Sequence, residues 1–387
     1  MADVQLGRSR AVRRVYGFDE ISLVPSIVTI NPEDTDVSWT VADKKFDIPI
    51  IASAMDSVVS PKTAIELTKV GTFGALNLQG VWTRYEEAEK ILEKIASVEK
   101  EKYVELMQKL YEEPIKKELI VKRIKEIKDG GGFAAVSSIP QQATEFGKIA
   151  RDAGAEMFVL QSTVISTKHK SKSSAPLDLN TFCKEMEIPV MVGNCVTYEV
   201  ALTLMGTGVA AVLVGIGPGA ACTSRGVLGV GIPMATAIAD CAAARDSYFK
   251  ENGKYIPIIA DGGLVSGGDI CKAIACGADA VMTGSQIARS KEAPGNGYHW
   301  GMATPNATLP RGSRIKVGTI GTLKEILYGP AKFDDGSMNL VGALKTSMGT
   351  LGAENLKEMQ QVQIVIAPSI LTEGKVYQKA QQLGMYK

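Results

Sequence analysis

The sequence feature that most constrains the fold is an alternation of short apolar runs with longer segments of helical periodicity, repeated eight times. The runs are followed by glycine or polar residues, as expected of parallel strands that are covered on both faces. The predicted strands span residues 48–52, 72–78, 133–139, 156–160, 188–192, 209–214, 256–260 and 280–283. Eight strand-then-helix units favour a closed (β/α)8 TIM barrel over an open doubly wound sheet. The predicted fold class is therefore α/β.

Two segments interrupt this alternation. Residues 82–128 shift to Glu and Lys, with Ile, Leu and Val at helical spacing, which predicts a solvated helical arm or, as the alternative, a surface for oligomer contacts. Residues 294–349 are rich in Gly, Pro and Thr and are predicted to form a long lid over the site, before a closing helix at 352–363. We assign arm, lid and barrel to one catalytic domain, 1–387.

Charge and composition exclude several classes of function. The formal net charge is +1, which provides no general attraction for a nucleic-acid backbone, and no apolar run is long enough to span a membrane. Residues 1–14 lack the apolar core of a secretory signal, so we expect a cytoplasmic protein. Only two histidines are present, and the six cysteines include no Cys-x-x-Cys pair, which disfavours a zinc site or a serine triad.

Cys222 is the candidate nucleophile. It emerges from a loop in which Gly215, Gly217 and Gly219 follow the sixth predicted strand. Glycines allow the loop backbone to turn its amides or carbonyls toward one centre, and amides near a thiolate can lower the pKa of the thiol. The alternative is a small buried thiol, the commoner role of a free cysteine, but the glycine-rich setting favours a nucleophile.

Other candidate site residues lie where predicted strands end, because function in such barrels is located at the carboxyl ends of the strands. Glycine pairs follow the last two strands, where a phosphate is commonly held by backbone amides. Asp261, beside one pair, could accept hydrogen bonds from ribose hydroxyls, with a helix cap as the alternative role. A nucleoside monophosphate is thus the predicted ligand. The strand-end residues are Ser53, Met55, Asn77, Gln161, Asn194, Asp261, Gly262, Gly263, Gly284 and Ser285.

Taken together, these motifs resemble the IMP dehydrogenase and GMP reductase superfamily. The matching segments, in order, are Gly17–Pro25, Ser53–Asp56, Gly217–Arg225, Ile259–Gly263, Met282–Ser285 and Glu292–Gly295. The resemblance implies that Cys222 attacks C2 of the bound purine, with Ser224 matching the family's threonine beside that cysteine. It also implies a substrate site at Ser53, Met55, Asp261, Gly262, Gly263, Gly284 and Ser285, and an NAD site at Gln161, Ser162, Asn194 and Gly215.

The resemblance leaves the direction of the reaction open. In the dehydrogenase branch IMP is oxidised to XMP with NAD, and in the reductase branch GMP is converted to IMP and ammonia with NADPH. The segment Glu292–Gly295 favours the dehydrogenase. The alternatives are a GMP reductase and a purine nucleotide-binding regulator on a decayed barrel. An FMN-dependent oxidase, which also uses late glycine pairs, would require a bound flavin.

The sequence departs from the family pattern in several places. The arm stands where the family carries paired regulatory CBS domains, as in the short IMP-dehydrogenase-related proteins of some bacteria. Residues 316–321 take the place of the family's Tyr-Arg-Gly-Met-Gly-Ser motif, Gln161 replaces an aspartate, and Leu213 replaces an arginine. The Arg-Tyr pair that activates water is missing after the barrel. The candidate substitutes are Arg311, Arg314, Tyr328 and Glu292.

The resemblance further implies a potassium site and an oligomer. The backbone carbonyls of Gly217, Gly219 and Cys222 would hold K⁺ together with Glu373 and Gly374 of a neighbouring subunit. Lys375 follows where the family has a second glycine, and we expect its ammonium group to make activity less dependent on potassium. A homotetramer or larger assembly is the family expectation.

Overall fold

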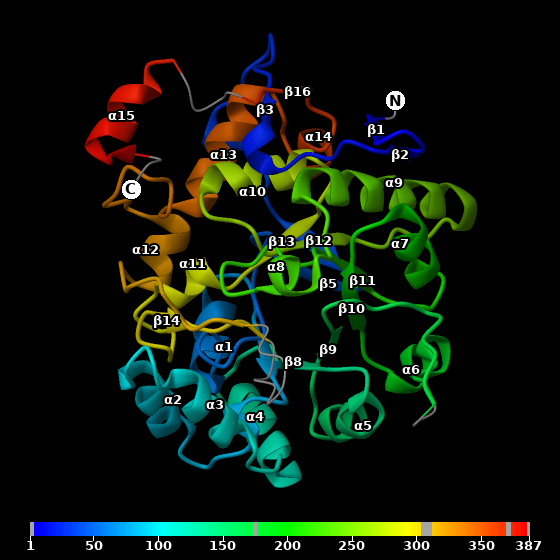
Figure 1. Ribbon diagram of the computed structural model, residues 1–387, viewed down its shortest axis with the longest axis vertical. Coiled ribbons are helices and arrows are strands. Elements are labelled where there is room, and N and C mark those ends of the chain that lie inside the picture. Colours follow the sequence, from blue (N-terminus) through cyan, green and yellow to red (C-terminus); the bar gives the residue numbers. More distant parts are fainter. Residues whose placement is uncertain (1–3, 173–175, 303–311, 369–372, 385–387) are drawn as a thin grey trace.

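The computed structural model describes residues 4–172, 176–302, 312–368 and 373–384. At its centre lies a sheet of eight parallel strands, which confirms the predicted (β/α)8 barrel (Figure 1). The strands are β6 Ile50–Ala52, β7 Ala75–Asn77, β8 Ala135–Ser138, β9 Met157–Gln161, β10 Val190–Cys195, β11 Ala211–Val214, β12 Ile258–Asp261 and β13 Ala280–Thr283. β6 pairs with β13, and the Ala52 amide donates to the Phe73 carbonyl at 3.0 Å beside β7, which closes the barrel.

A ring of helices covers the outer face of the strands. After each strand in turn come α1 Pro61–Lys69, α4 Lys117–Asp129, α5 Ala143–Asp152, α6 Leu179–Met186, α7 Tyr198–Met205, α9 Met234–Asn252, α10 Gly267–Ala275 and α13 Leu340–Leu351. Their starts follow local chemistry: the Ser60 side chain accepts from the Thr63 amide at α1, and the Thr197 side chain accepts from the Val200 amide at α7. No helix in these described ranges is long and apolar enough to cross a membrane.

The predicted lid is wrong in its second half. Residues 323–328 form α12 and residues 340–351 form α13, which buries Leu340, Leu344 and Met348 and packs on α10 as the eighth barrel helix. Glycines in this segment hid its helical character. One of them, Gly349, lies against the Ile30 carbonyl oxygen, and an added Cβ would approach that oxygen to 2.4 Å. The predicted closing helix at 352–363 is reduced to α14 Leu356–Met359.

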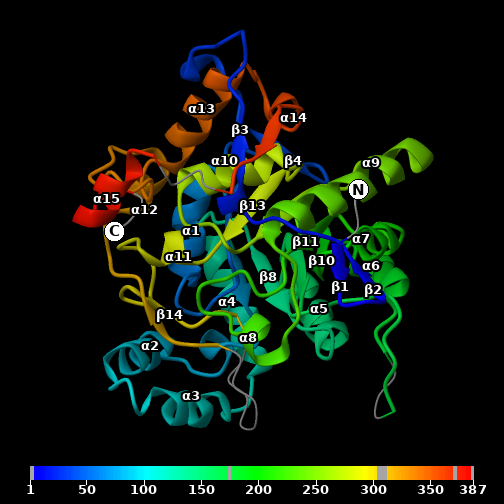
Figure 2. The same cartoon turned by 45° about the horizontal axis from the view of Figure 1, so that its top comes forward.

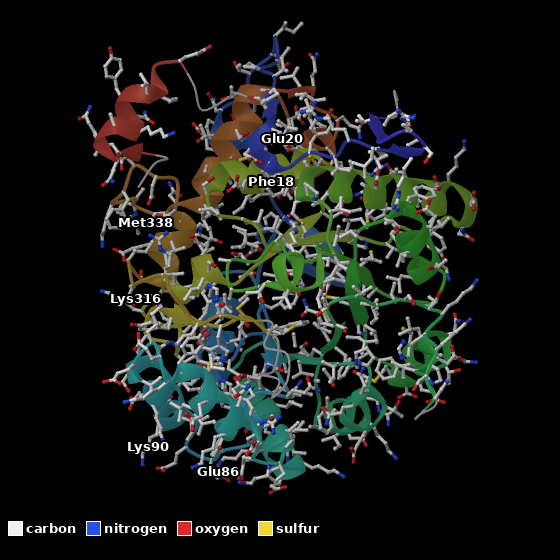
Figure 3. The ribbon with its side chains drawn as sticks, in the orientation of Figure 1. Phe18, Glu20, Glu86, Lys90, Lys316 and Met338 are labelled. Carbon is white, nitrogen blue, oxygen red and sulfur yellow. The ribbon has the colours of Figure 1, made fainter. Side chains whose placement is uncertain are left out.

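Only part of the predicted arm is an excursion from the barrel. The arm proper consists of α2 Ala88–Ser97 and α3 Tyr103–Tyr111, whereas α4 belongs to the helical ring. Glu86 and Lys90 are exposed on the outer side of the arm (Figure 3). The inner faces of α2 and α3 are buried through Leu92, Ile95, Met107, Leu110 and Tyr111. The arm is therefore solvated on its charged side, as predicted, while its apolar stripe packs against the rest of the chain.

The arm also lies beside the segment that follows the last strand. We call residues 295–302 and 312–322 the flap, which contains the short pair β14 Tyr298–His299 and β15 Ile315–Lys316. β14 lies next to α2 in both views of the ribbon (Figures 1 and 2). Arg314 of the flap donates to the Ile95 carbonyl of α2 at 2.5 Å, and its guanidinium lies 5.1 Å from the ring centroid of Tyr103 on α3.

Asp279, just before β13, anchors the amino-terminal end of the barrel. Its Oδ2 accepts from Arg245 Nη1 at 3.0 Å and from the Ile258 amide at 2.8 Å, and its Oδ1 accepts from the Tyr255 hydroxyl at 2.7 Å. Lys357 of α14 also contacts Oδ1, at 2.5 Å. Burial raises the pKa of the Asp279 carboxyl, but the charges of Arg245 and Lys357 outweigh burial and lower it. The buried carboxylate therefore joins β12, α9 and α14.

Asp279→Asn should lower the free energy of unfolding by about 3 kcal/mol or more, because it leaves the buried Arg245 charge without its counterion. Asp246 also contacts Arg245, at 2.8 Å, but its side chain is 63% exposed. Asp246→Asn is the matched control and should cost less than about 1 kcal/mol. Urea unfolding at neutral pH measures both changes. Similar losses in the two variants would contradict the anchoring role of Asp279.

Candidate active site

One cavity of about 480 Å³ opens at the carboxyl ends of the strands. It gathers residues that come from six of the eight strand ends, since the carboxyl ends of parallel strands meet at one face of a barrel. The sequence-predicted residues that line it are Ser53, Met55, Gln161, Ser162, Asn194, Gly215, Gly217, Gly219, Cys222, Ser224, Asp261, Gly262, Gly263, Gly284 and Ser285. Asn77, also predicted, is buried and does not line the cavity.

The Cys222 loop is held from both sides. The Cys222 amide donates to the Gly219 carbonyl at 3.0 Å, which closes a turn, and the Ser313 amide of the flap donates to the Ala221 carbonyl at 2.9 Å. Arg225 Nε donates to the Ile216 carbonyl at 3.1 Å and so fixes the start of the loop. The half-buried Cys222 thiol lies 3.3 Å from Ser224 Oγ. The thiol is thus fixed on the wall of the cavity beside one hydroxyl.

The other cysteines are less suited to nucleophilic chemistry. Burial raises the pKa of the Cys183 and Cys271 thiols to about 11 and that of Cys276 to about 12. Cys195 and Cys241 are buried against each other, with their sulfurs 4.0 Å apart. None of the five lines the cavity. Because the thiolate is the attacking form, a thiol that resists ionisation is a poor nucleophile.

Asp261 is oriented by two amide side chains. Its Oδ2 accepts from Gln161 Nε2 at 2.7 Å and from Asn194 Nδ2 at 2.8 Å. Burial raises the pKa of the Asp261 carboxyl to about 6, although both amide hydrogen bonds lower it. The amides come from the ends of β9 and β10 and the carboxylate from the end of β12, so three strand ends contribute to this hydrogen-bonded group.

Backbone conformation and close packing explain why two glycines follow Asp261. Gly262 and Gly263 have φ of +84° and +74°, in the left-handed region that favours glycine. They pack directly against the Cys222 loop, and a Cβ on Gly263 would lie 2.9 Å from the Pro218 Cβ. These glycines therefore allow the turn after β12 and the cysteine loop to share one wall of the cavity.

Sequence reasoning missed the contribution of the flap and of the turn after β13. Trp300, His299, Gly301 and Met302 line the cavity from the flap, and Arg289 lines it from the end of α11 Ser285–Ala288. Composition contained a signal, because His299 is one of two histidines and Trp300 one of three tryptophans in the chain. Arg289 follows Ser285 by four residues, a spacing that places both on one side of a helical turn.

Trp300 is fixed by a buried chain of hydrogen bonds that begins at Asp56, after β6, the first strand of the barrel. Its indole Nε1 donates to the Tyr111 hydroxyl at 2.9 Å, and that hydroxyl donates to Asp56 Oδ2 at 2.5 Å. The Val81 amide donates to the same carboxylate oxygen at 3.0 Å. Burial raises the pKa of the Asp56 carboxyl to about 6, against the lowering effect of the Tyr111 hydrogen bond. Through Tyr111, α3 of the arm therefore sets the position of a cavity wall.

Three of the four candidate water-activating residues lie outside the cavity. The Arg314 guanidinium binds the arm and lies 5.0 Å from the Tyr298 ring centroid, Tyr328 donates to the Val70 carbonyl at 2.8 Å, and Glu292 Oε2 accepts from the Leu323 amide at 2.8 Å. None of these three lines the cavity. Arg311 lies outside the described residues. Glu373 and Gly374 lie just before α15 Lys375–Gln381, at the edge of this chain (Figure 1).

The fold and the place of the cavity define a (β/α)8-barrel of the enzyme type, with its site at the carboxyl ends of the strands. Residues 15–377 match the family model described as IMP dehydrogenase / GMP reductase domain. The chain belongs to this family and is an oxidoreductase of it.

Named relatives support this assignment at two levels of similarity. An uncharacterized oxidoreductase of Mycolicibacterium smegmatis is 39% identical over 372 residues, covering 94% of this chain and 99% of that protein. The inosine-5'-monophosphate dehydrogenase of Methanocaldococcus jannaschii is 28% identical, covering 92% of this chain and 94% of that protein. The crystal structure of an IMP dehydrogenase/GMP reductase-like protein from Corynebacterium glutamicum superposes with a TM-score of 0.89 at 36% identity, covering 94% of this chain and 97% of that chain.

Tyr111→Phe should lower the free energy of unfolding by about 1–3 kcal/mol and alter the tryptophan emission spectrum, because it removes the acceptor for Trp300 and a donor to buried Asp56. Tyr103→Phe, on the same helix, keeps the ring that contacts Arg314 and is the control. Urea unfolding monitored by fluorescence measures both. Unchanged emission in Tyr111→Phe would refute the positioning of Trp300 by Tyr111.

Asp261 should make the stability of the protein depend on pH between about 4 and 6. Its pKa is about 6 in the folded chain and 3.8 ordinarily, so the folded state keeps a proton that the unfolded state releases. The contribution of Asp261 to the free energy of unfolding is therefore fully present below pH 3.8. It is lost as the pH rises toward about 6, which lowers the free energy of unfolding by up to about 3 kcal/mol. Asp261→Asn should lack this loss when unfolding is measured across the range. Parallel pH profiles for wild type and variant would contradict it.

Proposed function

We propose that this oxidoreductase is an IMP dehydrogenase, which oxidises IMP to XMP with NAD and so serves guanine nucleotide synthesis. One observation carries the proposal: the Cys222 thiol and the Asp261 carboxylate face the same cavity, with glycine turns at 262–263 and 284–285 on its wall. Membership of the family limits the substrate to the purine nucleotides on which its named relatives act.

Each part of the nucleotide has a matching group in the cavity. The Asp261 carboxylate, oriented by Gln161 and Asn194, accepts hydrogen bonds from the ribose hydroxyls. Backbone amides of the two glycine turns hold the phosphate. Ser53 and Met55, at the end of β6, bound the site on the side of the last turn, where Gly284 lies against the Met55 side chain.

The covalent step uses Cys222. Its thiol loses a proton and attacks C2 of the purine, forming an S–C2 bond, and Ser224 Oγ at 3.3 Å receives the hydrogen bond of the thiol before attack. Loss of hydride from C2 leaves a thioimidate on the cysteine. Water then adds at C2, the S–C2 bond breaks, and XMP and the free thiol result. The overall balance is IMP, NAD⁺ and water giving XMP, NADH and a proton.

The residues present fit a nicotinamide carboxamide beside the purine. Gln161 Oε1 is buried and has no hydrogen-bond partner in the described part of the chain, so it is an acceptor that a carboxamide N–H would satisfy. Ser162, Asn194 and Gly215 line the same region and would hold the cofactor with it. When bound, NAD supplies the hydride acceptor. The protein contributes the orientation of the two ligands.

One sequence-based candidate for water activation remains, directly before the second part of the flap in the sequence. Gly312 forms an antiparallel bridge with Cys222, so this part of the flap lies directly beside the nucleophile. Arg311 precedes Gly312 in the sequence, whereas Arg314, Tyr328 and Glu292 are held away by their own contacts. Arg311 lies outside the described residues and stays a sequence-based candidate for the water-activating role.

Potassium and oligomerisation complete the proposal. The carbonyls of Gly217, Gly219 and Cys222 share one loop, and the Gly219 oxygen, which accepts from the Cys222 amide, keeps a second lone pair for a cation. Glu373 and Gly374 of a neighbouring subunit in a tetramer would complete the site. Lys375 begins α15 beside them, and its ammonium group would reduce the dependence on potassium.

Absorbance at 340 nm tests the function directly. With IMP and NAD the absorbance should rise, and Cys222→Ala should reduce the rate on the order of 10³-fold or more, because the covalent route is lost. Cys183→Ala, a cysteine outside the cavity, is the control and should keep the rate. Intact-mass measurement of quenched reactions should show a nucleotide adduct only where Cys222 is present.

Other outcomes of the same assay would overturn the proposal in distinct ways. A fall in absorbance with GMP and NADPH, with ammonia released, would make the protein a GMP reductase. No change with either pair of substrates, together with thermal stabilisation by IMP, would indicate a nucleotide-binding regulator. A yellow purified protein with a flavin spectrum would indicate an FMN-dependent oxidase.

A further inference from the structure

Cys195 and Cys241 form a pair of free thiols between the barrel wall and its helical ring. Cys195 is the last residue of β10, and Cys241 lies on α9, 46 residues further along the chain. Their sulfur atoms are 4.0 Å apart, a separation that leaves no room for another atom between them. Neither cysteine lines the cavity or belongs to the segments that resemble the family. The proposed function therefore makes no use of this pair.

The two thiols are enclosed but only weakly held. The Cys241 sulfur lies 3.7 Å from the Thr197 carbonyl oxygen, and the side chains of Cys195 and Cys241 are 2% and 0% exposed. A thiol is a weak hydrogen-bond donor, so these contacts restrain the sulfurs little. Each sulfur can therefore turn toward the other by rotation about its Cα–Cβ bond.

The two thiols differ in how readily they ionise. The hydrogen bond to Cys195 and burial together raise the pKa of the Cys241 thiol. Cys241 therefore keeps its proton when Cys195 ionises, and its S–H donates to the Cys195 thiolate. Because the thiolate is the attacking form, Cys195 is the thiol of the pair that reacts first with an oxidant, and Cys241 is the one that resolves the product.

Burial restricts the oxidant to a small uncharged molecule, and hydrogen peroxide meets this condition. The Cys195 thiolate attacks one peroxide oxygen, the O–O bond breaks, and the departing hydroxide takes up a proton to become water, which leaves a sulfenic acid on Cys195. The Cys241 sulfur, held in contact, then attacks the sulfenic sulfur. An S–S bond forms, the S–O bond breaks, and a second water leaves with the Cys241 proton. Two thiols and one peroxide thus give one disulfide and two waters.

The main chain of β10 couples this pair to the cavity. Asn194, the residue before Cys195, donates from Nδ2 to Asp261 Oδ2 at 2.8 Å. The Cys195 carbonyl accepts from the Gly215 amide at 3.0 Å, where the Cys222 loop begins. A disulfide requires its sulfurs to be about 2 Å apart. Closing the gap draws Cys195 outward toward α9, away from these two contacts.

We propose that Cys195 and Cys241 form a reversible disulfide with a hydroperoxide as the oxidant, and that this disulfide displaces Asn194 from Asp261 and weakens ligand binding in the cavity. The effect on IMP rests on the proposed function. The disulfide itself rests on the positions of the two sulfurs.

Peptide mapping tests the disulfide. Cys222→Ser is the background, because it removes the cavity thiol that would also react with peroxide. After treatment with hydrogen peroxide, a non-reducing digest should contain joined peptides that carry residues 195 and 241, and dithiothreitol should separate them. Cys195→Ala or Cys241→Ala, added to this background, should abolish the linkage. Cys271→Ala, which removes another buried cysteine, should keep it. Oxygen added to other cysteines while 195 and 241 stay unlinked would refute the disulfide.

Calorimetry with IMP tests the coupling to the cavity. Oxidation of the Cys222→Ser protein should raise the Kd of IMP roughly 10-fold, because a hydrogen bond that orients the Asp261 carboxylate is lost, and dithiothreitol should restore the original Kd. The same treatment should leave the Kd unchanged when Cys241→Ala is also present. Oxidised protein that contains the disulfide and binds IMP with the Kd of the reduced protein would overturn the coupling.

The two measurements separate this inference from the proposed function. If the reduced protein neither binds nor oxidises IMP and the joined peptides still appear, the proposed function fails and the disulfide stands. If the wild-type protein oxidises IMP and the two peptides remain separate after peroxide treatment, the disulfide fails alone.

Discussion

The structure depends on the parallel closure of its central sheet. Because β6 pairs with β13 and the Ala52 amide reaches the Phe73 carbonyl beside β7, every strand end points to the same face. Residues as far apart in sequence as Ser53 and Ser285 therefore share one cavity. At the opposite end, buried Asp279 joins β12, α9 and α14 through hydrogen bonds and ion pairs. One end of the barrel is thus built for rigidity and the other for binding.

The barrel was predictable from sequence because its strands carry their signal locally. Runs such as 209–214 are apolar on both faces, end in glycine and are followed by helical periodicity. Two elements escaped this reasoning. α13 buries Leu344 and Met348 among glycines that local composition assigns to a loop, and α4 has the same charged composition as the arm although it packs in the ring. In both cases tertiary packing decided the outcome.

The residues of the candidate site also fall into those that local sequence predicts and those that long-range packing places. Asp261, Cys222 and the glycine turns could be predicted because their place at strand ends follows from the barrel. The place of Trp300 in the cavity and of Arg314 outside it could not, because long-range contacts position them: Trp300 binds Tyr111, 189 residues away in sequence, and Arg314 binds the Ile95 carbonyl, 219 residues away. A candidate base such as Arg314 looks plausible in sequence, and only the arm shows that its guanidinium is already occupied.

These contacts link the arm physically to the candidate active site. The flap contributes Trp300 to the cavity wall and pairs with the Cys222 loop, while the arm holds the flap through Tyr111 and through the Ile95 carbonyl. Any movement of the flap away from Cys222 must therefore break hydrogen bonds to the arm, including one in a buried chain that ends at the Asp56 carboxylate. Breaking such buried bonds costs more than breaking exposed ones. The charged outer surface of α2 and α3 thus conceals an inner face that holds one wall of the candidate active-site cavity in place.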